Sequence, residues 1–127
     1  MDHERMNILL VEDNPGDQVL IKEAIETAGL KARLITSQDG EKGILKAEGL
    51  SAKDFVIIDT LLPGIDGFET CQRIRRNNRD VNIIIYTGVI DAVDAAKART
   101  HGADEYCVKT EEGSHLISCI KRILNDA

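Results

Sequence analysis

The chain has 127 residues, of which 43% are hydrophobic and 30% charged, with a formal net charge of −6. This balance is typical of one globular domain with its own core, and no apolar run approaches the roughly 20 residues that a membrane span needs. The acidic charge disfavours direct binding to nucleic acid, and the polar amino end lacks the apolar core of a secretory signal, so we expect a cytoplasmic protein.

Hydrophobic periodicity predicts five strands that alternate with five helices. Four strands are short apolar runs, and the second shows a weaker alternation that favours an edge strand. The expected strands are 6–11, 32–36, 54–59, 81–86 and 105–108. Capping signals mark the helices. The first runs from Asn14-Pro15 to Gly29, the second from Asp39 to about Glu48, and the fourth from Asp91 to Gly102. Asp66 with Glu69 starts the third helix, and Thr110 with Glu111 and Glu112 starts the fifth.

Strands that alternate with helices predict an α/β, doubly wound (βα)5 fold, in which a parallel five-stranded sheet has helices on both faces. Because crossovers between parallel strands are right-handed, strands one and three can be neighbours only if strand two lies beyond strand one. The predicted strand order is therefore 2-1-3-4-5. We expect a single domain over 1–127, structured from about 6 to 125.

Polar side chains follow the apolar runs at the points where the predicted strands end. Glu12 and Asp13 follow the first strand, and Asp59 closes the third. Thr87 follows the fourth strand and Lys109 the fifth. Since the carboxyl ends of parallel strands meet at one edge of the sheet, we expect these five residues to converge on the crevice beside strands one and three.

Three carboxylates within about 5 Å of one another repel by roughly 3 kcal/mol per pair at an effective dielectric near 20. Lys109 neutralises only one of them, so the cluster favours a hard divalent cation, for which Mg²⁺ is the usual choice. Asp59 is then a candidate nucleophile for a phosphoryl group, with Lys109 and the Thr87 hydroxyl as partners of the phosphoryl oxygens. The alternative for Asp59 alone is a capping residue of the following turn.

The three cysteines, Cys71, Cys107 and Cys119, have no metal-ligand spacing and lie in apolar surroundings. We interpret them as reduced residues in or near the core. The three histidines are scattered along the chain and are interpreted as surface residues.

The acidic pair Glu12-Asp13, Asp59 within the pattern D-x-x-x-P-x-x-D-G, Thr87-Gly88 and Lys109 together resemble the receiver domain of two-component response regulators, the CheY-like family. The resemblance covers essentially the whole chain and implies a flavodoxin-like three-layer sandwich. It also implies a phosphorylation switch, in which Asp59 accepts a phosphoryl group from a sensor histidine kinase or a phosphotransfer protein. Such a domain is not a conventional enzyme, because it catalyses only its own phosphorylation and dephosphorylation.

The resemblance further assigns roles to individual residues. Glu12, Asp13, Asp59 and the backbone carbonyl of Leu61 would hold Mg²⁺, for which Mn²⁺ can substitute. Thr87 and Tyr106 would form the switch. A downstream protein or a second copy would bind the face made by the fourth helix, the fifth strand and the fifth helix, with no direct contact to nucleic acid or membrane.

One departure from the family pattern and three alternative functions remain. Thr110 stands where the family has a proline after a cis peptide, so we expect a trans Lys109-Thr110 bond. The main alternative is a degenerate receiver that acts as a phosphorylation-independent interaction module. A phosphatase of the haloacid-dehalogenase kind is disfavoured because Leu61 replaces its second aspartate, and an FMN carrier because the acidic loop would repel the flavin phosphate. The chain is either a stand-alone regulator or a receiver cut from a longer protein.

Overall fold

The computed structural model describes residues 5–88, 92–110 and 113–126. The described strands are β1 (Met6–Val11), β2 (Ala32–Ser37), β3 (Phe55–Asp59), β4 (Asn82–Thr87) and β5 (Glu105–Val108). The described helices are α1 (Pro15–Thr27), α2 (Gly40–Ala47), α3 (Gly67–Asn77), α4 (Ala92–Thr100) and α5 (Ser114–Asp126). No helix in this part of the chain is long and apolar enough to cross a bilayer.

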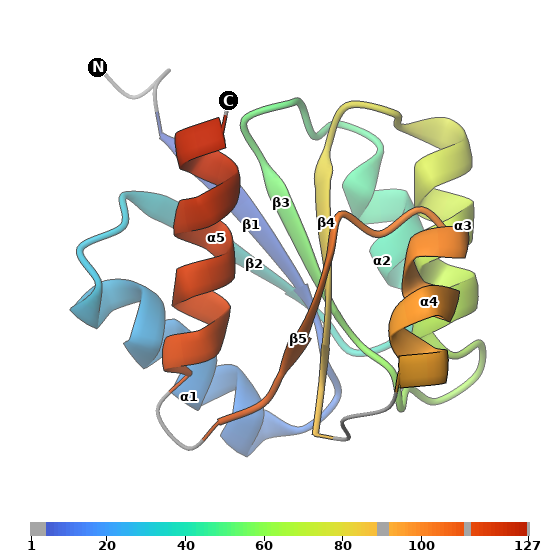
Figure 1. Ribbon diagram of the computed structural model, residues 1–127, viewed down its shortest axis with the longest axis horizontal. Coiled ribbons are helices and arrows are strands. Elements are labelled where there is room, and N and C mark those ends of the chain that lie inside the picture. The colour runs from blue at the N-terminus through green and yellow to red at the C-terminus, as the bar shows by residue number, and fades with distance from the viewer. Residues whose placement is uncertain (1–4, 89–91, 111–112, 127) are drawn as a thin grey trace.

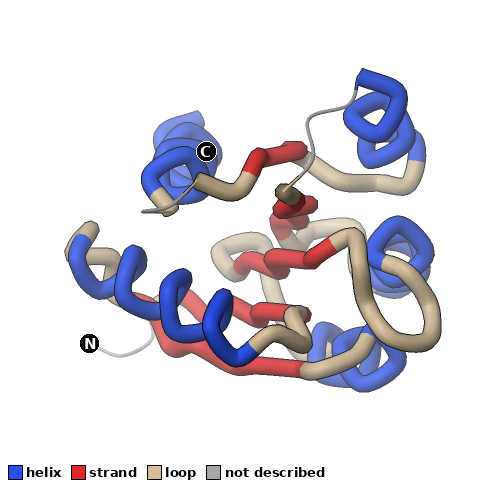
Figure 2. The backbone as a smooth tube through the Cα atoms, turned by 90° about the horizontal axis from the view of Figure 1, so that it is seen from below, coloured by secondary structure: helices blue, strands red, loops and turns tan. Residues whose placement is uncertain are grey.

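The strands form one parallel sheet in the order β2-β1-β3-β4-β5, as predicted. Helices α1 and α5 cover one face, and α2, α3 and α4 cover the other (Figure 1). Figure 2, which views the molecule from below, shows the sheet between these two helical layers. The predicted three-layer α/β sandwich is therefore confirmed. All five strands point their carboxyl ends toward the lower edge of the molecule in Figure 1.

The central strand β3 is buried along its whole length and divides the core in two. Successive side chains of a strand point to opposite faces of its sheet. Ile57 accordingly packs with α1 and α5, whereas Val56 and Ile58 pack with α2, α3 and α4. The strand β2 lies at the sheet edge and exposes Arg33, which confirms the edge assignment.

The capping signals place most helix ends correctly. The Asn14 side chain accepts a hydrogen bond from the Asp17 amide at 3.0 Å, and the Asp66 side chain accepts one from the Glu69 amide at 2.9 Å. Gly29, just after α1, has a positive φ of 73°, which glycine adopts without strain.

The start of the last helix differs from the prediction. Helix α5 begins at Ser114 and not at Thr110, because Gly113 adopts a positive φ of 68° that is incompatible with a continuous helix. Glu111 and Glu112, which were expected in its first turn, lie outside the described residues. Asp91, the expected cap of α4, also lies outside them.

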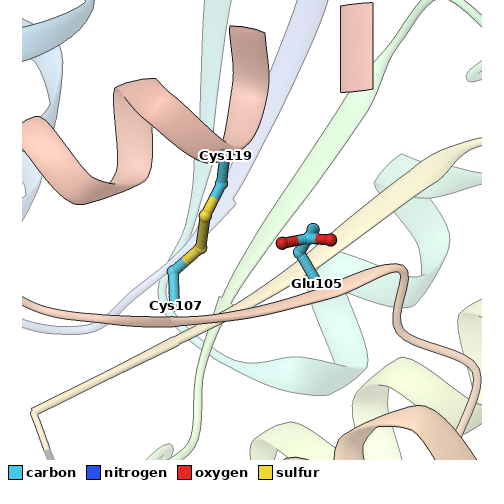
Figure 3. A group of neighbouring side chains, drawn as sticks. All are labelled: Glu105, Cys107 and Cys119. Atoms are coloured by element: carbon cyan, nitrogen blue, oxygen red, sulfur yellow. A yellow bond between two sulfur atoms is a disulfide. The ribbon is translucent and has the colours of Figure 1, made fainter. Parts of the chain in front are cut away.

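Two of the three cysteines form a disulfide, so their interpretation as reduced residues is wrong. Cys107 of β5 and Cys119 of α5 are bonded, with Cα atoms 7.1 Å apart (Figure 3). Both are buried in the core, as expected, and Cys71 is a buried free thiol whose pKa burial raises to about 12. Glu105 lies beside the disulfide, but its carboxylate pairs with Arg122 at 2.6 Å. Metals bind thiolates, so bonded sulfurs and a paired carboxylate make no metal site.

A buried carboxylate at the other end of the sheet ties two strands together. Asp54, which is 2% exposed, accepts hydrogen bonds from the Asn7 amide at 2.8 Å and from the Ser51 amide at 2.8 Å. Its carboxylate also accepts a bond from the Ser51 hydroxyl at 3.2 Å. The side chain therefore satisfies backbone groups where β1 and β3 begin.

We expect Asp54→Ala to lower the free energy of unfolding by about 2 kcal/mol, because it removes the charged acceptor of the Asn7 and Ser51 amides. Chemical denaturation measures this loss. Asp80→Ala removes an exposed carboxylate of the same type and should change stability by less than about 0.5 kcal/mol. Equal effects of the two substitutions would contradict the proposed role of Asp54.

Gly67, the first residue of α3, lies against the backbone of Asp59. A Cβ atom at this position would overlap the Asp59 carbonyl oxygen and approach the Thr60 Cα to 2.8 Å. The Gly67 amide also donates to the Thr60 carbonyl at 3.1 Å. The glycine of the D-x-x-x-P-x-x-D-G pattern thus allows α3 to begin directly beside the end of β3.

Gly67→Ala should destabilise the protein by about 2 kcal/mol, because the added methyl group must displace the backbone that carries Asp59. The matched control is Gly49→Ala, where a Cβ atom would meet nothing within 4 Å. We expect that control to change stability by less than about 0.5 kcal/mol. Chemical denaturation of both variants measures their free energies of unfolding. An unchanged value for Gly67→Ala would show that the loop after β3 moves without an energetic cost, and would contradict the prediction.

Candidate functional site

Three carboxylates meet at the carboxyl ends of β1 and β3. Asp59 is the last residue of β3, and Glu12 and Asp13 directly follow β1. One carboxylate oxygen from each residue lies within 4.8 Å of the others. Glu12 is 1% and Asp59 8% exposed, whereas Asp13 faces solvent. The cluster therefore has two buried acids and one open side.

Glu12 is held in this position by the start of α1. Its carboxylate accepts a hydrogen bond from the Asn14 amide at 3.2 Å, and its backbone carbonyl accepts one from the Gln18 side chain at 2.6 Å. Burial raises the pKa of Glu12 to about 7, an effect that Lys109 opposes and the neighbouring Asp59 reinforces. Burial is therefore the main cause of the raised pKa, even though Lys109 pairs with this carboxylate.

Lys109 follows β5 and points into the cluster. Its ammonium nitrogen lies 3.0 Å from Glu12 Oε1, 3.4 Å from Asp59 Oδ2 and 2.9 Å from Asp17 Oδ2. There is no cis peptide among the described residues, which confirms the expected trans bond before Thr110. Lys109 reaches Asp59 without the family proline, since its own amide is fixed by a 2.6 Å hydrogen bond to the Thr87 carbonyl.

Two threonines lie beside Asp59 on the neighbouring strand end and in the following loop. Thr87 is the last residue of β4 and is 3% exposed. Its hydroxyl lies 3.0 Å from the hydroxyl of Thr60, the residue after Asp59. The register pairs Asp59 with Tyr86, so Thr87 extends one residue past the phosphoacceptor candidate. The Thr87 hydroxyl is therefore held against the residue that directly follows Asp59.

The remaining predicted residues lie on the rim and on the outer strand. Leu61 is 78% exposed, and its amide lies 3.4 Å from Asp59 Oδ1, so the chain turns around the carboxylate here. Tyr106 of β5 is half-buried and packs against the core beneath α2, α3 and α4.

Sequence reasoning missed two contributors, Asp17 and Thr60. Asp17 was not among the predicted site residues, yet its carboxylate contacts Lys109 across the site. Its position three residues after the capping Asn14 was the available signal, because the first turn of α1 begins next to the end of β1. Nothing in the pattern around Thr60 indicated its contact with Thr87.

The donor set suits a hard divalent cation. Of the three clustered carboxylates, Glu12 and Asp59 share one lysine, and that lysine also pairs with Asp17. Oxygen ligands with unneutralised negative charge and one solvent-facing member are the arrangement that Mg²⁺ uses when it keeps part of its water shell. The residues present therefore fit such an ion.

The comparisons with known proteins agree with this geometry. A family model described as the response regulator receiver domain matches residues 8–121. The transcriptional regulatory protein AfsQ1 of Streptomyces coelicolor is 36% identical over 118 residues, which are 93% of this chain and 51% of AfsQ1.

Two solved structures share both fold and sequence. The receiver domain of the sensor histidine kinase PA1611 from Pseudomonas aeruginosa, solved with a magnesium ion in its active-site cleft, is 29% identical with a TM-score of 0.80, and the match covers 95% of this chain and 98% of that one. The BeF3-activated receiver domain of DrrB is 25% identical with a TM-score of 0.81, and the coverage is the same.

This chain corresponds to one part of its longer relatives. The chain spans about half the length of AfsQ1 and of the related regulators IrlR of Burkholderia pseudomallei and PhoP of Bacillus subtilis. The family match, in contrast, extends over almost the whole chain and includes every strand end described above. The chain belongs to the response regulator receiver domain family.

Proposed function

We propose that this domain is a phosphorylation-dependent signalling switch in which Asp59 accepts the phosphoryl group. The observation that carries the proposal is the placement of Lys109 Nζ within 3.4 Å of Asp59 Oδ2, beside a cluster of three carboxylates. A nucleophilic carboxylate, a fixed cation and a group of oxygen ligands are the parts that phosphoryl transfer requires.

The transfer uses a phosphohistidine of a sensor kinase or phosphotransfer protein as donor. An oxygen of Asp59 attacks the phosphorus, the phosphorus–nitrogen bond breaks, and its electron pair returns to the imidazole nitrogen. Lys109 offsets charge on the phosphoryl oxygens, and the Thr87 hydroxyl donates a hydrogen bond to one of them. Because Asp59 is 8% exposed, the donor must approach along the solvent-facing side near Asp13.

The residues that would hold Mg²⁺ are Glu12, Asp13, Asp59 and the backbone carbonyl of Leu61. When bound, the ion neutralises charge between the Asp59 carboxylate and the incoming phosphoryl group. The related PA1611 receiver was solved with magnesium in its cleft, which supports this assignment.

The response travels to a partner through the face formed by α4, β5 and α5. Thr87 ends β4 and Lys109 directly follows β5, and the Lys109 amide donates to the Thr87 carbonyl at 2.6 Å. A phosphoryl group that draws both side chains inward would shift the ends of these two strands together. Tyr106 of β5 would follow, and a downstream protein or a second copy of the domain would read the changed surface.

Asp59→Asn should abolish phosphorylation by acetyl phosphate in the presence of Mg²⁺, because an amide oxygen is a far weaker nucleophile. Intact-mass spectrometry of the parent should show one added phosphoryl group that hydroxylamine removes.

Asp66→Asn is the matched control, since Asp66 belongs to the same loop but serves as the cap of α3. It should retain phosphorylation. A parent that stays unmodified with both acetyl phosphate and a histidine kinase would instead favour a degenerate receiver that acts only as an interaction module.

Mg²⁺ should raise the midpoint of thermal unfolding of the parent, and chelation should reverse the change. At a hundredfold excess over its dissociation constant the ion would add about 2.7 kcal/mol of stability. Asp13→Asn should lose most of this gain and still fold, since Asp13 is exposed. Calorimetry with and without the ion measures the difference, and an unchanged gain in Asp13→Asn would exclude Asp13 as a ligand.

A further inference from the structure

Asp17 joins the site from the first turn of α1. Its backbone amide donates to the Asn14 side chain at 3.0 Å, which fixes the turn. Its carboxylate contacts the Lys109 ammonium at 2.9 Å, across 92 positions of sequence. This is the shortest of the contacts between Lys109 and a carboxylate, although Asp17 is not part of the three-carboxylate cluster.

Lys109 is confined on several sides. Asp17 and Glu12 accept from its ammonium group, and the aromatic ring of Tyr86 lies 5.8 Å from the ammonium nitrogen. Burial alone would lower the pKa of Lys109, but hydrogen bonds with Asp17 and Glu12 outweigh it and raise the pKa. The lysine is therefore charged, and its ammonium group is held by both Asp17 and Glu12.

The carboxylates that contact Lys109 differ in whether they belong to the candidate metal site. Glu12 and Asp59 are members of the cluster that suits a divalent cation, so a bound cation competes with Lys109 for them. Asp17 lies outside the cluster, and its side chain is 39% exposed, so it can remain a partner of the lysine when the cluster binds a cation. Lys109 can thus release Glu12 without losing all of its ionic partners.

We propose that Asp17 is a positioning residue that holds Lys109 at the edge of the acidic cluster when a divalent cation occupies Glu12, Asp13 and Asp59. The proposal rests on the metal site described under the proposed function. Its consequence is that Asp17 lowers the cost of displacing the lysine from Glu12, and at the same time keeps the ammonium group within reach of Asp59.

A double-mutant cycle on Mg²⁺ affinity tests this role, with isothermal titration calorimetry of the parent, Asp17→Asn, Lys109→Met and the double variant. We expect Asp17→Asn to weaken Mg²⁺ binding about threefold in the parent background and by less than about 1.5-fold when Lys109 is already methionine. An equal loss in both backgrounds would show that Asp17 acts on the ion by its charge alone, and would overturn the proposal.

Two further variants separate positioning from net charge. Asp17→Glu keeps a carboxylate that can reach Lys109 and should restore most of the parent affinity. Glu23→Gln removes an exposed acid from the same helix and should leave the affinity unchanged. A loss in Glu23→Gln equal to that in Asp17→Asn would overturn the proposal. Failure of the parent itself to bind Mg²⁺ would overturn the metal site and this inference with it.

Discussion

The site depends on one ammonium group that faces three acids from different elements. Glu12 follows β1, Asp17 lies in the first turn of α1 and Asp59 ends β3, and Lys109 lies within 3.4 Å of a carboxylate oxygen of each. Buried acids of like charge repel one another, so a site that brings them together needs a permanent cation. The lysine supplies it from β5, and its backbone is hydrogen bonded to β4. The ends of all these elements are therefore coupled electrostatically.

The parallel sheet explains how residues so far apart in sequence meet. Every strand runs in the same direction, so each delivers its last residue to one edge, and the right-handed crossovers put β1 beside β3. The long apolar strands fix that arrangement through two cores, and Gly67 permits α3 to start against the Asp59 backbone. The polar cluster therefore rests on apolar packing that it does not itself provide.

The features of the fold and the site that depend on hydrophobic periodicity and on the residues at strand ends were predicted from the sequence. The strand order follows from the right-handed crossovers between strands, and the convergence of Glu12, Asp13, Asp59 and Lys109 follows from their positions at the ends of the strands. Asp17, Thr60 and the disulfide could not be predicted in this way. Their contacts depend on side-chain direction across the fold, which joins residues 92, 27 and 12 positions apart. The start of α5 was missed because Gly113 interrupts a segment with good capping residues.

The pair of threonine hydroxyls gives the site a second connection between β3 and β4. Thr60 follows Asp59 directly, and its hydroxyl lies 3.0 Å from that of Thr87. If Thr87 donates its only hydroxyl proton to a phosphoryl oxygen, Thr60 must act as the donor within the pair, since each hydroxyl carries one proton. Phosphorylation of Asp59 would thus fix the direction of a hydrogen bond that either hydroxyl can donate in the resting protein. The loop after β3 and the end of β4 would then respond to the same event as Lys109.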